Sequence, residues 1–185
     1  MPHSLIMNGK NELVIYGTTG SSDFPTTSGA YQESFGGGSP TATILGTTFS
    51  AGTDAFVAIL SPDGSQLVSS TYLGGLGNDG ISPTASQLTR NYGDQHRGEV
   101  FIDGSDNVYV AGNTNSTNLF VSDGVKSFDR TYGGGLTVGF AVKFNSDLSS
   151  LEWGGYLGGS QSDVSLAVKV DVGGNALIAG GTEST

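Results

Sequence analysis

The sequence predicts an all-β fold made of repeated four-stranded antiparallel units. Glycine contributes 31 of the 185 residues and charged residues only 13%, so turns should be frequent and long surface helices few. Val, Ile, Thr, Tyr and Phe fill the short apolar runs, which is typical of strands. Two motifs also recur along the chain, and such internal repetition is the signature of a repeat protein.

The first motif predicts two strands joined by a tight polar turn. It occurs at 8–19, 103–114 and 171–182, and the three copies align without gaps. Asn8-Gly9 and Asp103-Gly104 are hairpin-turn dipeptides. We therefore expect hairpins whose strands lie at about 4–7 and 13–16, at 99–102 and 108–111, and again before residue 185.

The second motif predicts another hairpin in each unit. It begins at Phe56 and ends at Gly75, and it returns from Phe140 to Gly159. Tyr72 of the first copy and Tyr156 of the second recur at matching strand positions, as Phe56 and Phe140 do, so these aromatic side chains should form the core between units. The expected strands are 54–60, 67–73, 138–144 and 151–157.

Four antiparallel strands that recur in tandem suit radial stacking around an axis, so the chain is predicted to form β-propeller-type blades. The first blade spans 1–75. An inter-blade insertion and the second blade span 76–159, and the first half of a third blade spans 160–185. About two and a half blades result, a partial propeller. Because propellers close with about 4 to 8 blades, either the natural chain is longer or copies assemble.

The repeats resemble the bacterial SBBP (seven-bladed β-propeller) repeat. The residues that carry this resemblance are Asp54-Ala-Phe-Val-Ala-Ile-Leu-Ser-Pro-Asp-Gly-Ser65, Ser70-Thr-Tyr-Leu-Gly-Gly75 and the segment 17–32. The second copy departs from the pattern, with Ser146-Asp-Leu148 where the first has Pro-Asp-Gly. The resemblance implies a scaffold in a secreted or cell-surface bacterial protein, and any export signal would lie outside this sequence.

The connections between hairpins are long, and they are expected on one face of the propeller. Loops that carry function would lie there. Two insertions are not repeated, at about 39–51 and 81–97, and the second concentrates the residues that we predict to bind a ligand: Arg90, Tyr92, Asp94, His96 and Arg97. The alternative is that this insertion is a solvated loop or packs against the neighbouring blade.

Asp79 and Asp163 occupy equivalent positions in the two copies. Their periodicity is compatible with repeated Ca²⁺ sites, which use oxygen ligands, and equally with turn capping by aspartate. Apart from Ca²⁺, no cofactor is predicted.

The net charge of −10, with seven basic residues spread along the chain, argues against nucleic acid as a partner. No apolar run approaches the roughly 20 residues of a membrane span, so membrane insertion is not expected. We predict a noncatalytic extracellular scaffold that binds or adheres to a cell-surface protein or glycan, with further blades or self-association completing it. The alternative is a secreted glycan-active hydrolase or lyase with its site on the propeller axis, and a third interpretation is a pure spacer.

Overall fold

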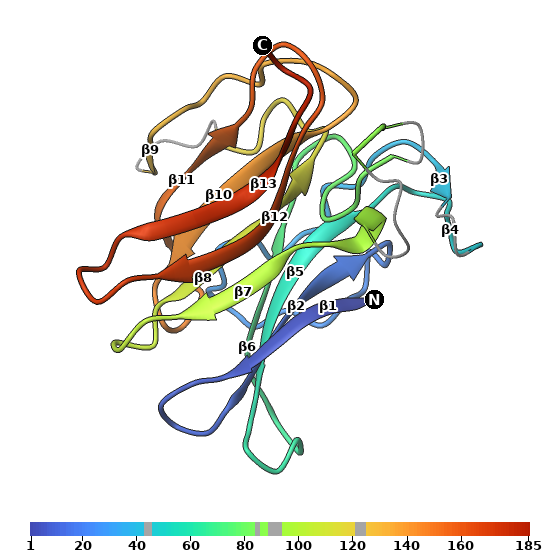
Figure 1. The fold of residues 1–185 in the computed structure, drawn as a ribbon. Helices are drawn as coiled ribbons and strands as arrows, with labels where there is room; N and C mark the ends of the chain where they lie inside the picture. The colour runs from blue at the N-terminus through green and yellow to red at the C-terminus, as the bar shows by residue number, and fades with distance from the viewer. Residues whose placement is uncertain (43–45, 84–85, 89–93, 121–124) are drawn as a thin grey trace.

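A computed structural model describes residues 1–42, 46–83, 86–88, 94–120 and 125–185, and it confirms that the fold is all-β (Figure 1). The strands are β1 (Pro2–Met7), β2 (Leu13–Thr19), β3 (Thr41–Ala42), β4 (Thr48–Phe49), β5 (Asp54–Leu60), β6 (Leu67–Leu73), β7 (Glu99–Ile102), β8 (Val108–Thr114), β9 (Lys126–Ser127), β10 (Val138–Phe144), β11 (Leu151–Leu157), β12 (Asp163–Val170) and β13 (Ala176–Thr182). A short 3-10 helix, η1 (Asp94–His96), precedes β7.

Two sheets repeat the same strand order. The first sheet is β1-β2-β5-β6, and the second begins β7-β8-β10-β11, with every one of these neighbours antiparallel. The second sheet carries one more short strand, β9, which runs parallel to β11. The hairpin β12-β13 forms a third sheet, and β3 pairs with β4. The four consecutive antiparallel strands expected from the repeat are thus present in both complete copies.

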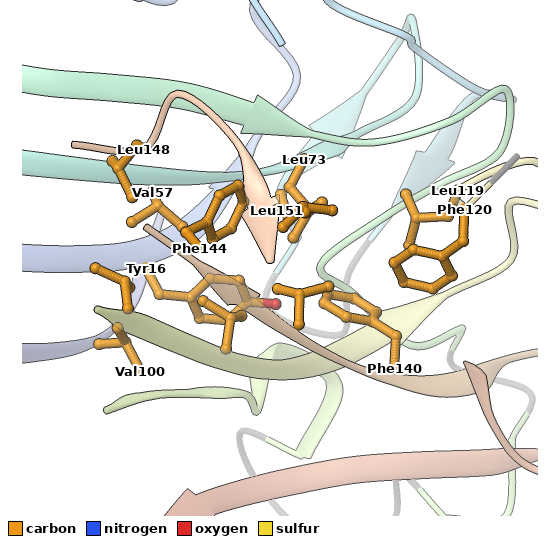
Figure 2. Packing of buried hydrophobic residues seen from close by; sticks show 14 of the residues in the cluster. Tyr16, Val57, Leu73, Val100, Leu119, Phe120, Phe140, Phe144, Leu148 and Leu151 are labelled. Atoms are coloured by element: carbon orange, nitrogen blue, oxygen red, sulfur yellow. The ribbon is translucent and has the colours of Figure 1, made fainter. Parts of the chain in front are cut away.

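The first and second sheets stack face to face, and their facing side chains form the main core. Alternate side chains of a strand point to opposite faces, so Val14 and Tyr16 of β2 both point toward the second sheet. Val110, Phe140 and Phe144 meet them from β8 and β10, and Figure 2 shows these aromatic rings between the two sheets. Burying a side chain such as Phe144 contributes about 1.5–3 kcal/mol.

The opposite face of the second sheet packs on the third. Tyr109 and Ala111 alternate with the residues of β8 that face the first sheet, and they form a separate cluster with Val168 of β12. Five partly buried side chains complete this cluster: Phe101, Trp153, Val170, Ala176 and Ile178. The second sheet is therefore apolar on both faces and lies between the other two.

The strands that carry the second motif have their predicted bounds, and so does β7. The strands β2 and β8 instead run three residues beyond their predicted ends, to Thr19 and Thr114, because Gly17 and Gly112 continue the ladders opposite Phe56 and Phe140. A Cβ on Gly17 would lie 2.8 Å from the Phe56 ring, so only glycine allows this close pairing. The strands β3, β4 and β9 lie in the long connections and were not predicted.

A left-handed backbone at Leu148 places a buried side chain in the core. Its φ is 61°, and the equivalent turn of the first copy has Gly64 with φ 71°. The left-handed conformation costs about 1–2 kcal/mol for a residue other than glycine. The Leu148 side chain is fully buried in the main core, and its carbonyl oxygen accepts a hydrogen bond from the Tyr31 N–H at 2.9 Å. Burial of the leucine offsets the backbone cost.

Tyr72 and Tyr156 are both buried, but only Tyr156 belongs to the predicted core between the first and second sheets. Tyr72 instead packs against Phe24 and Phe35 of a long connection. Each tyrosine hydroxyl forms hydrogen bonds to a long connection. The Tyr156 hydroxyl donates to the Ser116 carbonyl oxygen at 2.8 Å and accepts from the Leu119 N–H at 2.9 Å. The Tyr72 hydroxyl donates to the Ser21 carbonyl oxygen at 2.8 Å. The two hydroxyl groups therefore differ in one respect: only that of Tyr156 satisfies a buried N–H group.

We expect Tyr156→Phe to lower the free energy of unfolding by about 1–3 kcal/mol, because the Leu119 N–H is left buried without a partner. Tyr72→Phe removes one donor only, and its loss should be about 0.5–1.5 kcal/mol. Urea denaturation of the two variants measures both values. Equal losses would contradict the different roles assigned to the two hydroxyl groups.

Candidate functional site

The tight turns and the long connections lie at opposite ends of the sheets (Figure 1). This follows from the strand order, because each hairpin turns at one end and each connection between hairpins starts at the other. The long connections span 20–53, 74–98 and 115–137. Surfaces formed by such connections are where proteins commonly place binding residues.

A pocket of about 490 Å³ opens at this end, where β1, β7 and β12 lie side by side (Figure 1). Each of these is the first strand of its sheet, and we call the site the first-strand pocket. It is lined by the start of β1, the segment that leads into β7, and the middle of β12: Pro2, His3, Ser4, His96, Arg97, Gly98, Glu99, Leu166 and Ala167.

Two imidazole rings meet beside this pocket. The ring centroids of His3 and His96 are 5.7 Å apart, and His3 also meets the ring of Tyr16 edge-on at 5.5 Å. The ring nitrogens of both histidines are buried and have no hydrogen-bond partner within the described part of the chain. Burial lowers the pKa of His3 to about 3, helped by His96 and the N-terminal ammonium, and burial also lowers the pKa of His96. Both rings are therefore neutral at pH 7, and each offers one donor and one acceptor.

The charged residues of the pocket also fix the strands. One oxygen of Glu99 accepts from the Val168 N–H at 2.9 Å, and the other pairs with the Lys169 ammonium at 2.9 Å, so Glu99 joins β7 to β12. The Ser4 hydroxyl accepts from the Val100 N–H at 3.3 Å and joins β1 to β7. Among the described residues that line the pocket, Glu99 carries the one carboxylate.

The predicted ligand-binding residues are only partly brought together. Arg90 and Tyr92 lie outside the described residues. Asp94 is buried and holds the Arg97 guanidinium at 3.3 Å, with the Arg97 side chain 59% exposed. His96 and Arg97 line the first-strand pocket, whereas Asp94 does not.

The same segment also packs against its surroundings. Gln95 is fully buried, and its carbonyl oxygen accepts from the Ser82 N–H at 3.0 Å. The Asn113 side chain donates to the Arg97 carbonyl oxygen at 3.1 Å. The end of the insertion thus combines packing residues with residues that face the pocket.

Sequence reasoning missed His3 and Glu99. A signal was nevertheless present: in the alignment of the repeats, His3 corresponds to Gly98, the residue that follows the insertion. Equivalent starts of neighbouring units lie close together in a stack, so His3 belongs beside the end of the insertion.

Asp79 and Asp163 each close the turn that follows the last strand of a sheet. Asp79 accepts from the Gly75 N–H at 2.8 Å, from the Ser116 hydroxyl at 2.8 Å and from the Thr114 hydroxyl. Asp163 accepts from the N–H of Gly159 at 2.7 Å and from a serine hydroxyl of the C-terminal segment at 3.0 Å. The described residues contain no group of three His, Cys, Asp or Glu side chains arranged to hold a metal ion, and calcium binding stays a prediction.

Comparison with models of known families and with curated proteins finds no match for this chain. In the part of the chain that the structure describes, no helix has the length and apolar character needed to cross a membrane.

Replacing His3 should change how stability depends on pH. The pKa of His3 is about 3 in the folded chain, against 6.5 for an unperturbed histidine, so the unfolded chain binds more protons between these values. The stabilisation from the neutral ring is complete above pH 6.5 and is lost as pH falls toward 3. In urea unfolding at pH 4 to 7, His3→Gln should flatten the dependence by at most about 1.4 kcal/mol per pH unit. An unchanged slope would contradict the buried neutral imidazole.

Asp79 should act in the opposite direction. Burial raises its pKa to about 7. Three hydrogen bonds lower this pKa in part, and the negative charge of Asp54 raises it further. The folded chain then holds a proton that the unfolded chain releases near pH 3.8, so this contribution is present at low pH and is lost as pH rises to 7. Asp79→Asn should gain stability relative to the parent chain as pH rises from 4 to 8, measured by urea unfolding. A constant difference across this range would show that Asp79 is ionised throughout.

Proposed function

We propose that this chain is a noncatalytic extracellular scaffold of the β-propeller type, which binds a cell-surface protein or glycan through the face that carries the long connections. The observation that supports this most directly is the first-strand pocket. Three consecutive sheets contribute to it, and the described end of the non-repeated insertion forms one wall. Stacked four-stranded antiparallel units and the resemblance to a bacterial propeller repeat support the scaffold role.

The chemistry of the pocket suits recognition of uncharged hydroxyl groups. Arg97 offers guanidinium donors at the mouth, and Leu166 with Ala167 supplies an apolar wall, whereas the ring nitrogens of His3 and His96 are buried beneath the pocket surface. A sugar presents hydroxyl groups around an apolar ring, so a glycan is the ligand class that this surface fits best. Hydrolysis of a glycoside by the common mechanisms uses two carboxylates, whereas Glu99 is held in an ion pair with Lys169.

A glycan array probed with the parent chain, Arg97→Ala and Lys10→Ala tests this proposal. Both substitutions remove one positive charge from an exposed side chain, but Lys10 lies in a tight turn at the opposite end of the sheets. We expect Arg97→Ala to lose at least about tenfold in affinity, which corresponds to about 1.4 kcal/mol, and Lys10→Ala to bind as the parent does.

Three results would contradict the proposal. The parent chain could bind neither the array nor a panel of cell-surface proteins, or both variants could lose affinity equally, which would indicate a general effect of charge. Release of shortened glycans during the incubation would favour the hydrolase or lyase instead.

A further inference from the structure

The second sheet carries an apolar surface beside the third sheet. A cavity of about 310 Å³ is lined by six apolar side chains: Phe128, Ala141, Trp153, Leu157, Ala176 and Ile178. Next to it, a cavity of about 320 Å³ extends along β13 past Gly180. We call the two together the docking groove. Phe128 is 54% exposed here, although it contacts the ring of Trp153.

The repeat shows what covers the equivalent surface of the first sheet. Ala141 and Leu157 correspond to Val57 and Leu73, which are completely buried in the main core. The hairpin β10-β11 covers that surface, and Phe140 is among the side chains it contributes. On the second sheet, the equivalent cover would be a hairpin placed next to β13.

Gly180 identifies one side chain of that missing cover. In the first sheet Gly17 pairs with Phe56, and in the second Gly112 pairs with Phe140. The ring lies directly against the glycine in both, since an added Cβ would come within 2.8 Å and 2.9 Å of the ring atoms. Gly180 occupies the same repeat position. Within the described residues, β13 pairs only with β12, so no aromatic residue stands opposite Gly180.

We propose that the docking groove and the edge of β13 that faces away from β12 bind a β-hairpin that carries the same repeat pattern. Backbone groups of β13 add the first strand of this hairpin by β-augmentation. An aromatic side chain of that strand lies opposite Gly180, and the alternate apolar side chains fill the groove over Leu157 and Trp153. The partner is thus defined by its pattern, which is that of β5-β6 and β10-β11.

The peptide that corresponds to residues 53–75 of this chain is a suitable probe. It contains the β5-β6 hairpin and no tryptophan, while Trp153 is the single tryptophan of the whole chain and lines the groove. Adding the peptide should shift the emission of Trp153 to shorter wavelength in a saturable manner. The same peptide with Phe56→Ala should bind at least about tenfold more weakly. Absence of a saturable shift, or equal binding of the two peptides, would overturn the proposal.

Two substitutions in the full chain locate the binding surface. Phe128 is 54% exposed and Leu177 is 55% exposed, but Leu177 alternates with Ala176 and Ile178 and so points away from the groove. Phe128→Asp should abolish binding of the peptide, and Leu177→Asp should leave it unchanged. Equal effects of the two variants would place the peptide elsewhere.

Light scattering without the peptide tests a different occupant. At every protein concentration at which Trp153 emission is unshifted, we expect the chain to be a monomer. A dimer whose formation shifts Trp153 emission would mean that the folded surface of a second copy fills the groove, and this would overturn the proposal of an added hairpin.

Discussion

Packing between the first and second sheets is the interaction on which the rest of the structure depends. Neither sheet can bury its apolar face alone, and the second sheet is apolar on both faces because Val108 and Val110 of β8 alternate with Tyr109 and Ala111. A sheet with this pattern is stable only between two others. Stacking is therefore a consequence of the alternation in one central strand, and the third sheet is required as much as the first.

The same packing creates the first-strand pocket. Face-to-face stacking places β7 between β1 and β12, and contacts through Ser4 and Glu99 then fix the three strands relative to one another. The pocket is thus a property of the stack and of no single unit. His3 and His96 are 93 residues apart in sequence, and their rings meet only because the first strands of two units run side by side.

How much of the fold could be predicted depended on repetition. Strands such as β5 and β10 were predicted to the residue because an apolar run, a polar turn and a second apolar run appear twice in the same register. The strands β3, β4 and β9 have two residues each. β3 pairs with β4 inside a long connection and β9 pairs with β11, and no alternating apolar run in the long connections predicts strands of this length. For the site, the absence of repetition identified His96 and Arg97. His3 was missed because its environment comes from another unit.

Asp79 and Asp163 show why a periodic carboxylate is ambiguous in a repeat protein. Ca²⁺ prefers about 6 to 8 oxygen ligands, and a repeated metal site would place an aspartate in every unit. A repeated junction does the same: Ser116 donates to Asp79, and Ser184, its counterpart in the next unit, donates to Asp163. Each carboxylate thereby connects the turn after one sheet to the end of the second strand of the next. Because the stack repeats this junction, its chemistry is repeated too, so the geometry of stacking is sufficient to produce the periodicity and the periodicity by itself does not distinguish a junction from a metal site.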